Sequence, residues 1–219
     1  MKMLRQTCSF LSHEIRSEWR APYVLQSTLL YVMCTVMIGY HSFQLIDAQT
    51  WNALYWIVMV FVAINSVSRS FLLESRQRAM FYYTLASPHV VLLARLIYNI
   101  VFLWLIAMLS AGAFAFFLGD MVENKTYFLL VLFLAALSLG STFTMISALA
   151  SRANNSYTMT SVMGFPVVIP QLLLLISQSN ASIAGAEISS GSEELVALVA
   201  ISMMIIILSF LIFPYLWRE

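Results

Sequence analysis

The sequence predicts an all-helical integral membrane protein with six transmembrane helices, organised as one domain over residues 1–219. Its residues are 61% hydrophobic and only 10% charged, and the mean hydropathy is +0.87. A soluble domain carries about 25% charged residues. Here the apolar residues gather in runs long enough to cross about 30 Å of hydrocarbon as helices. We therefore expect no soluble domain on either face.

Six runs without Asp, Glu, Lys or Arg define the expected spans. Their ranges are 23–46, 50–68, 96–119, 126–151, 157–176 and 195–216. Ten of the 11 Lys and Arg residues lie on one side of this arrangement, and only Lys125 lies on the other. Because loops rich in Lys and Arg remain in the cytoplasm, we expect a multi-pass protein with both termini there. The opposite loops are short and acidic, containing Asp47, Asp120, Glu123, Glu187, Glu193 and Glu194.

The N-terminal segment, residues 1–22, has the pattern of an amphipathic helix. Its apolar residues recur every three or four positions, which places them on one face, and polar residues occupy the other. These apolar residues are Leu4, Cys8, Leu11, Ile15 and Trp19. We expect an interfacial helix lying flat on the membrane before the first span. Packing against a partner protein is the alternative.

The largest charged island between the apolar runs is the region 69–95, which reads RSFLLESRQRAMFYYTLASPHVVLLAR. Aromatic residues lie among its charged residues, as they do on a surface that binds another protein. We interpret it as a short cytoplasmic coupling helix between spans two and three, and a plain basic loop is the alternative. The candidate coupling residues are Glu74, Arg76, Arg78, Phe81, Tyr82, Leu85 and Pro88.

The fifth run contains Pro166 and Pro170, four residues apart. Each proline removes a backbone donor and crowds the carbonyl four residues earlier, which predicts a kinked or broken helix near mid-membrane. The kink serves either packing alone or a hinge formed by Gly164, Phe165, Pro166 and Pro170. Gly164 would let another helix approach closely. We expect that contact from the small residues of the fourth run, Ser138, Gly140 and Ser141.

Residues that could carry out catalysis do not converge in this sequence. His13, His41 and His89 lie on different segments, and no pair has the spacing of a metal site. The sequence has no G-x-x-x-x-G-K-[ST] loop for a nucleotide, and its net charge of +1 gives no basic field for nucleic acid. We expect a non-catalytic subunit without a metal site, embedded in membrane lipid, whose energy comes from a partner.

Two stretches resemble a known family. One runs from Glu74 to Arg95 and contains LASP and LAR, and the other joins SALASRA, which begins at Ser147, to FPVVIP, which begins at Phe165. Over nearly its whole length the chain resembles the haem exporter protein B (CcmB) family, the membrane subunit of the cytochrome c maturation ABC transporter, an ABC-2 type permease. Ala79 and Tyr82 depart from the Gly and Glu usual in that family, which leaves the fit to the ATPase open.

The resemblance implies a bacterial inner membrane protein that couples ATP hydrolysis to haem export or to release of a haem-loaded chaperone. Its partners would be the ATPase subunit CcmA, which binds ATP and Mg²⁺ and seats the Glu74–Pro88 helix, the haem-handling CcmC, a small single-span subunit and the chaperone CcmE. This chain would bind no cofactor directly, and the complex would handle haem. His41 is the residue placed to meet haem near the outer face, and an interfacial role is its alternative. Two copies are expected.

Other classes of protein share parts of this pattern. A general ABC-2 type export permease for a lipid, a polysaccharide or a drug would have the same spans and the same coupling helix. A scaffold subunit would keep the complex assembled when the Glu74–Arg78 cluster is altered. An enzyme acting within the membrane is a weaker alternative, because it requires convergent catalytic residues.

Overall fold

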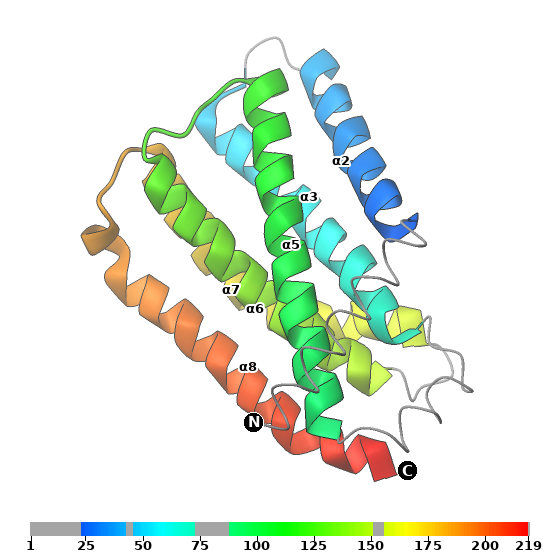
Figure 1. Cartoon of the computed structure of the whole chain (residues 1–219). Coiled ribbons are helices and arrows are strands. Elements are labelled where there is room, and N and C mark those ends of the chain that lie inside the picture. The colour runs from blue at the N-terminus through cyan, green and yellow to red at the C-terminus, as the bar shows by residue number, and fades with distance from the viewer. Residues whose placement is uncertain (1–22, 43–45, 73–87, 151–155, 219) are drawn as a thin grey trace.

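The computed structural model describes residues 23–42, 46–72, 88–150 and 156–218, and these are almost entirely helical (Figure 1). The described part of the chain contains no strand, which confirms the all-helical class. Its elements are α2 (Tyr23–Ser42), α3 (Ala48–Leu72), α5 (Pro88–Leu118), α6 (Lys125–Ala150), α7 (Ser156–Ile183), η1 (Ile188–Gly191) and α8 (Ser192–Arg218).

Within the described residues, five helices are long and apolar enough to cross a membrane: α3, α5, α6, α7 and α8. They correspond to five of the six predicted spans. The remaining one, α2, has 20 residues and is not among these five. The predicted interfacial helix, residues 1–22, lies outside the described residues.

Two helices extend beyond the spans predicted for them. Helix α5 begins at Pro88, whereas the third span was predicted to begin at residue 96. Proline suits the first helical position, where its missing N–H has no helical partner, and Arg95, which we assigned to the surface region, is only 3% exposed within α5. Helix α7 continues past residue 176 to Ile183, and its polar residues there find partners on neighbouring helices.

Helix α6 is the centre of the bundle, since it packs against α3, α5, α7 and α8. Small residues allow this close packing in a membrane, where backbones that approach closely gain van der Waals contact. At Gly140, a Cβ atom would lie 3.4 Å from the Cα atom of Ile100 on α5. A larger residue at this position would push α5 and α6 apart.

An aromatic cluster joins α3, α5 and α6. Trp51 and Tyr55 stack with ring centroids 5.7 Å apart, Phe114 meets both rings edge-on, and Phe128 lies 5.8 Å from Tyr55. The Tyr55 hydroxyl donates a 3.0 Å hydrogen bond to the carbonyl of Ala107. The hydroxyl of Tyr55 is thus satisfied inside the helix bundle, as a buried tyrosine requires.

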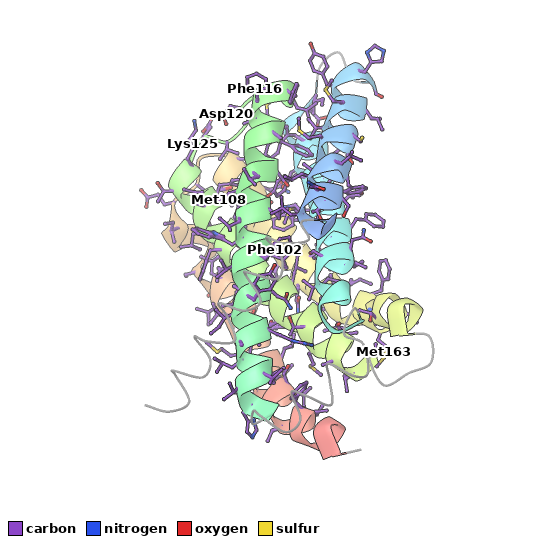
Figure 2. The ribbon with its side chains drawn as sticks, turned by 45° about the vertical axis from the view of Figure 1, so that its right-hand side comes forward. Phe102, Met108, Phe116, Asp120, Lys125 and Met163 are labelled. Atoms are coloured by element: carbon purple, nitrogen blue, oxygen red, sulfur yellow. The ribbon has the colours of Figure 1, made fainter. Side chains whose placement is uncertain are left out.

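One end of the bundle is rich in carboxylates. This end, here called the acidic end, contains the six predicted acidic residues from Asp47 to Glu194, together with Lys125. Lys125 Nζ lies 2.7 Å from an oxygen of Asp120, on the connection between α5 and α6 (Figure 2). This contact lowers the pKa of Asp120, and the Thr50 hydroxyl lowers the pKa of Asp47. Both carboxylates are therefore ionised at neutral pH.

Candidate functional site

The candidate coupling residues lie almost wholly outside the described part of the chain. Glu74, Arg76, Arg78, Phe81, Tyr82 and Leu85 all fall within residues 73–87. Pro88 is described, as the first residue of α5. The helices on either side of this segment, α3 and α5, pack against each other. Any force on residues 73–87 is therefore delivered to two adjacent helices.

Most of the described side chains in the first half of α7 are exposed. Val162 is 65% exposed, Phe165 is 51% exposed and Ile169 is 52% exposed, and both prolines are exposed as well. In Figures 1 and 2 the first turns of α7, drawn in yellow, project from the side of the bundle, and Met163 lies on this projecting part. This half of α7 therefore presents an apolar surface to lipid or to another protein.

Helix α7 is continuous from Ser156 to Ile183 with Pro166 and Pro170 inside it, so it is not broken into two helices. The prolines still deprive the carbonyls of Val162 and Pro166 of their helical donors. Inside a membrane such carbonyls need protein or water partners. Val162 and Pro166 both belong to the projecting half of α7, where their side chains are exposed. Their two carbonyls therefore also lie on this projecting half.

Gly164 makes the predicted close approach to α6, but not with the predicted residues. A Cβ atom at Gly164 would lie 2.9 Å from Cε1 of Phe143. Ser141 Oγ instead donates to the carbonyl of Ser138 within α6, and Gly140 faces α5. The contact was misassigned because small residues lie on more than one face of α6.

The second half of α7 is held by buried polar contacts. The first is with α6, where Gln171 Nε2 donates to Thr142 Oγ1 at 2.9 Å. Further along, Ser179 Oγ accepts from Trp56 Nε1 at 2.7 Å and donates to Asn52 Oδ1 at 2.6 Å. Asn52 Nδ2 in turn donates to Asn180 Oδ1 at 2.7 Å. These contacts fix α7 to both α3 and α6.

A second polar group joins α6, α7 and α8 at the acidic end. Gln178 on α7 is 2% exposed. Its Nε2 donates to Glu194 Oε2 of α8 at 2.6 Å, and its Oε1 accepts from the Tyr127 hydroxyl of α6. Nearby, Asn124 Nδ2 donates to the carbonyl of Ala186 at 3.0 Å. The polar contacts of this group and of the group described before it hold the second half of α7 against its neighbours. The first half of α7 is the exposed half.

Apart from Pro88, the predicted coupling residues lie outside the described residues, so the structure gives no position for them relative to the predicted hinge. Sequence reasoning also missed the polar contacts of the second half of α7. A signal for them was present, because Gln178, Ser179 and Asn180 are consecutive polar residues beside an apolar run, and polar residues in spans mark packing or function. Their partners on α3, α6 and α8 have no comparable signal.

Metal binding has no support in the residues that are described. No group of three or more His, Cys, Asp or Glu residues lies close enough to hold a metal ion there. His41 is exposed in the last turn of α2. His89 stacks on Phe210 at the opposite end of the bundle, with ring centroids 6.1 Å apart. These two histidines therefore do not meet.

Comparison with known families gives one match that covers nearly the whole chain. A family model described as CcmB protein matches residues 5–215. This range includes the coupling region, α7 and all the described polar contacts. No curated protein and no solved structure matches the chain.

Proposed function

The chain belongs to the CcmB family, the membrane component of a haem-export ABC transporter in cytochrome c biogenesis, and we propose that it converts ATP hydrolysis by a partner into export of haem or release of a haem-loaded chaperone. The observation that carries the proposal is the family match over residues 5–215. Five membrane-crossing helices support it. The proposed protein has six spans in the bacterial inner membrane, with both termini in the cytoplasm.

The proposed source of energy is the ATPase CcmA, which holds ATP and Mg²⁺. Residues 73–87 connect the adjacent helices α3 and α5, so a groove on the ATPase that grips this segment would move both helices. CcmC, a small single-span subunit and the chaperone CcmE complete the proposed assembly. Haem is the cargo of this assembly, and the chain itself holds no resident cofactor in this proposal.

Reversing two charges in the coupling region tests the proposed ATPase contact. In the variant with Glu74→Arg and Arg78→Glu, we expect the affinity for the ATPase to fall about tenfold, because charged pairs at the rim of an interface set docking and register. The two charges remain opposite and four positions apart, so any pairing between them is retained. Co-purification and ATP hydrolysis measure the effect. Unchanged binding and unchanged turnover would contradict the proposal.

Removing both prolines tests whether α7 contains a hinge. In the variant with Pro166→Ala and Pro170→Ala, two helical hydrogen bonds become available, and we expect the projecting half of α7 to straighten. If the bend is used in the transport cycle, matured cytochrome should fall about fivefold, the lower range of a coupling between sites. Normal maturation with a straightened helix would leave only a packing role for the bend.

The proposed transporter contains two copies of this chain, which meet through α2 and α7. The exposed apolar residues of α2 include Leu30 and Ile38, at 67% and 66% exposure, and the projecting half of α7 adds more apolar surface. A single cysteine introduced at Val162 or at Ile38 should form a cross-link with the same cysteine of a second copy in membranes. Absence of such cross-links, with the protein present at wild-type amounts, would place the second copy elsewhere.

The decisive test of the function is covalent haem in c-type cytochromes after deletion of the gene and its restoration. We expect cytochrome haem to be lost on deletion, to return with the wild-type copy, and not to return with the Glu74/Arg78 reversal. Normal cytochromes in the deletion strain would favour a general export permease for a lipid, a polysaccharide or a drug. The next step would then be to compare exported molecules in the two strains.

A further inference from the structure

Gln171 is an isolated polar residue in an apolar part of α7. It is the one hydrogen-bonding side chain between Ser161 and Ser177, and it follows Pro170 directly. The side chain is 0% exposed, so it faces the interior of the bundle. A buried polar group in a membrane span needs a partner within the protein, and such groups usually serve packing or function. The partner of Gln171 therefore decides what holds α7 beside its second proline.

That partner is Thr142 on α6, which is 1% exposed. Gln171 Nε2 donates a hydrogen bond to Thr142 Oγ1 at 2.9 Å, and the same hydroxyl lies 3.2 Å from Gln171 Oε1. Thr142 Oγ1 also lies 2.8 Å from the carbonyl oxygen of Ser138. Since a hydroxyl has one proton and two lone pairs, Thr142 can accept from Gln171 while it donates to Ser138. A buried, directional contact thus joins the two helices at this point.

The contacts of α7 change in kind at Gln171. Residues 162–170 contain no hydroxyl, amide or charged side chain. In this part Gly164 lies against the ring of Phe143, and Val168 belongs to the apolar core. Apolar contacts have no preferred direction, whereas hydrogen bonds weaken steeply when their angle changes. After Gln171, the buried hydrogen bonds of the second half hold α7 to α3, α6 and α8.

The backbone hydrogen bonds of α7 are interrupted just before Gln171. Pro166 and Pro170 leave the carbonyls of Val162 and Pro166 without helical donors, and these are the two prolines inside the helix. Sharp bends in helices occur mostly at such interruptions. The last interrupted bond and the first polar side chain after the prolines therefore meet at residues 170 and 171.

We propose that Gln171 is a positioning residue that fixes the pivot of α7, about which the projecting half swings while the second half stays in place. This pivot rests on the proposed function, since ATP binding and hydrolysis by the partner drive the swing. The prolines make α7 able to bend, and the contact of Gln171 with Thr142 holds the fixed side of the bend. Without this contact the bend would spread along α7, and the projecting half would occupy a wider range of positions.

Spin labels on both halves of α7 test the pivot. In a chain with Cys8→Ser and Cys34→Ser, either Met163→Cys or Leu173→Cys carries one label, and Leu129→Cys on α6 carries the other. All three labelled positions are exposed, and Met163 lies on the projecting half (Figure 2). Labelled chains are diluted into unlabelled chains of the complete complex, so each distance is measured within one copy. Between the nucleotide-free and the ATP-bound complex, the 163–129 distance should change and the 173–129 distance should not.

Two variants remove the hydrogen bond from opposite sides, Gln171→Leu and Thr142→Val, and each keeps a side chain of similar size. In both, the fraction of complexes whose 163–129 distance lies outside the wild-type range should rise about threefold, the factor for one membrane hydrogen bond of average strength. The double variant should show no further rise, because the two changes remove the same bond. The matched control is Thr35→Val on α2, whose hydroxyl donates to the carbonyl of Tyr31 in the same helix.

The yield of matured cytochrome per ATP links the pivot to transport. In Gln171→Leu and in Thr142→Val we expect this yield to fall about fivefold, while ATP hydrolysis stays within about twofold of wild type. Thr35→Val should keep the wild-type yield. If Gln171→Leu does not accumulate in the membrane, Thr142→Val decides.

Failure of the pivot and failure of the proposed function give different results. If the 173–129 distance changes as much as the 163–129 distance, α7 moves as a rigid body and the pivot is wrong. The pivot is also wrong if both variants, at wild-type amounts, keep the wild-type range of distances. In these two cases ATP-dependent maturation by the wild-type complex leaves the proposed function intact. If the wild-type complex itself does not mature cytochromes with ATP, the proposed function fails, and the pivot has no part in it.

Discussion

Replacing Asn52 with leucine should lower the free energy of unfolding by about 2–4 kcal/mol, because three hydrogen bonds that average about 0.6 and reach about 1.7 kcal/mol each in membranes are lost, and buried partners are left unpaired. Asn52 is 1% exposed. It donates to Asn180 Oδ1 at 2.7 Å and to the carbonyl of Ile176 at 3.2 Å, and it accepts from Ser179 Oγ at 2.6 Å. The second half of α7 should therefore loosen from α3.

The matched control for this substitution is Asn65→Leu on the same helix. The Asn65 side chain donates to the carbonyl of Phe61, within α3 itself. Unfolding of the two purified variants in mixed detergent micelles, titrated with a denaturing detergent, measures the difference. The role given to Asn52 would be refuted if Asn52→Leu and Asn65→Leu lost the same free energy.

Replacing Gly191 with alanine should cost about 2 kcal/mol of stability, in the range measured for overpacked sites. A Cβ atom here would lie well under 3.0 Å from both Gln178 Oε1 and the Tyr127 hydroxyl. These two atoms are hydrogen-bonded to each other, and Gln178 Nε2 is also bonded to Glu194. Since neither atom can retreat without losing a partner, the ends of α6, α7 and α8 should separate locally.

Gly112→Ala on α5 is the corresponding control, because nothing lies within 4 Å of the Cβ atom that it would add. Alanine also has a higher helix propensity than glycine, so this control should be neutral or slightly stabilising. Cross-linking of cysteines placed near the ends of α7 and α8 would report the local separation. If the two glycine variants were equally stable, the close packing of Gly191 against Gln178 and Tyr127 would not contribute to stability.

The prolines of α7 illustrate how far local sequence rules reach. Pro166 and Pro170 predicted a disturbed helix, and the structure keeps one continuous helix whose first turns project from the bundle. Local rules describe which hydrogen bonds are lost. Whether the helix then breaks depends on the neighbours that hold it, here Phe143 against Gly164 and Thr142 against Gln171. Those neighbours lie on another helix and leave no local signal.

Arg95 and Asn52 mark the limit of prediction from charge and hydropathy. We took Arg95 for a surface residue because charged residues usually end a span, but it is only 3% exposed near the start of α5. Nothing in the sequence distinguishes Asn52 from Asn65. In the described structure, Asn52 lies opposite polar groups of α7 and forms hydrogen bonds with them.

The sequence alone determined the helical membrane class, the approximate spans and the family resemblance, because each depends on the composition of a segment or on residues close together in the chain. The tertiary structure decided which faces of these helices meet. In lipid the apolar faces of all the helices are nearly equivalent, so close packing of small residues and paired polar groups choose the partners. The contact of Gly164 with Phe143 and the position of Gln178 between Tyr127 and Glu194 are consequences of that choice.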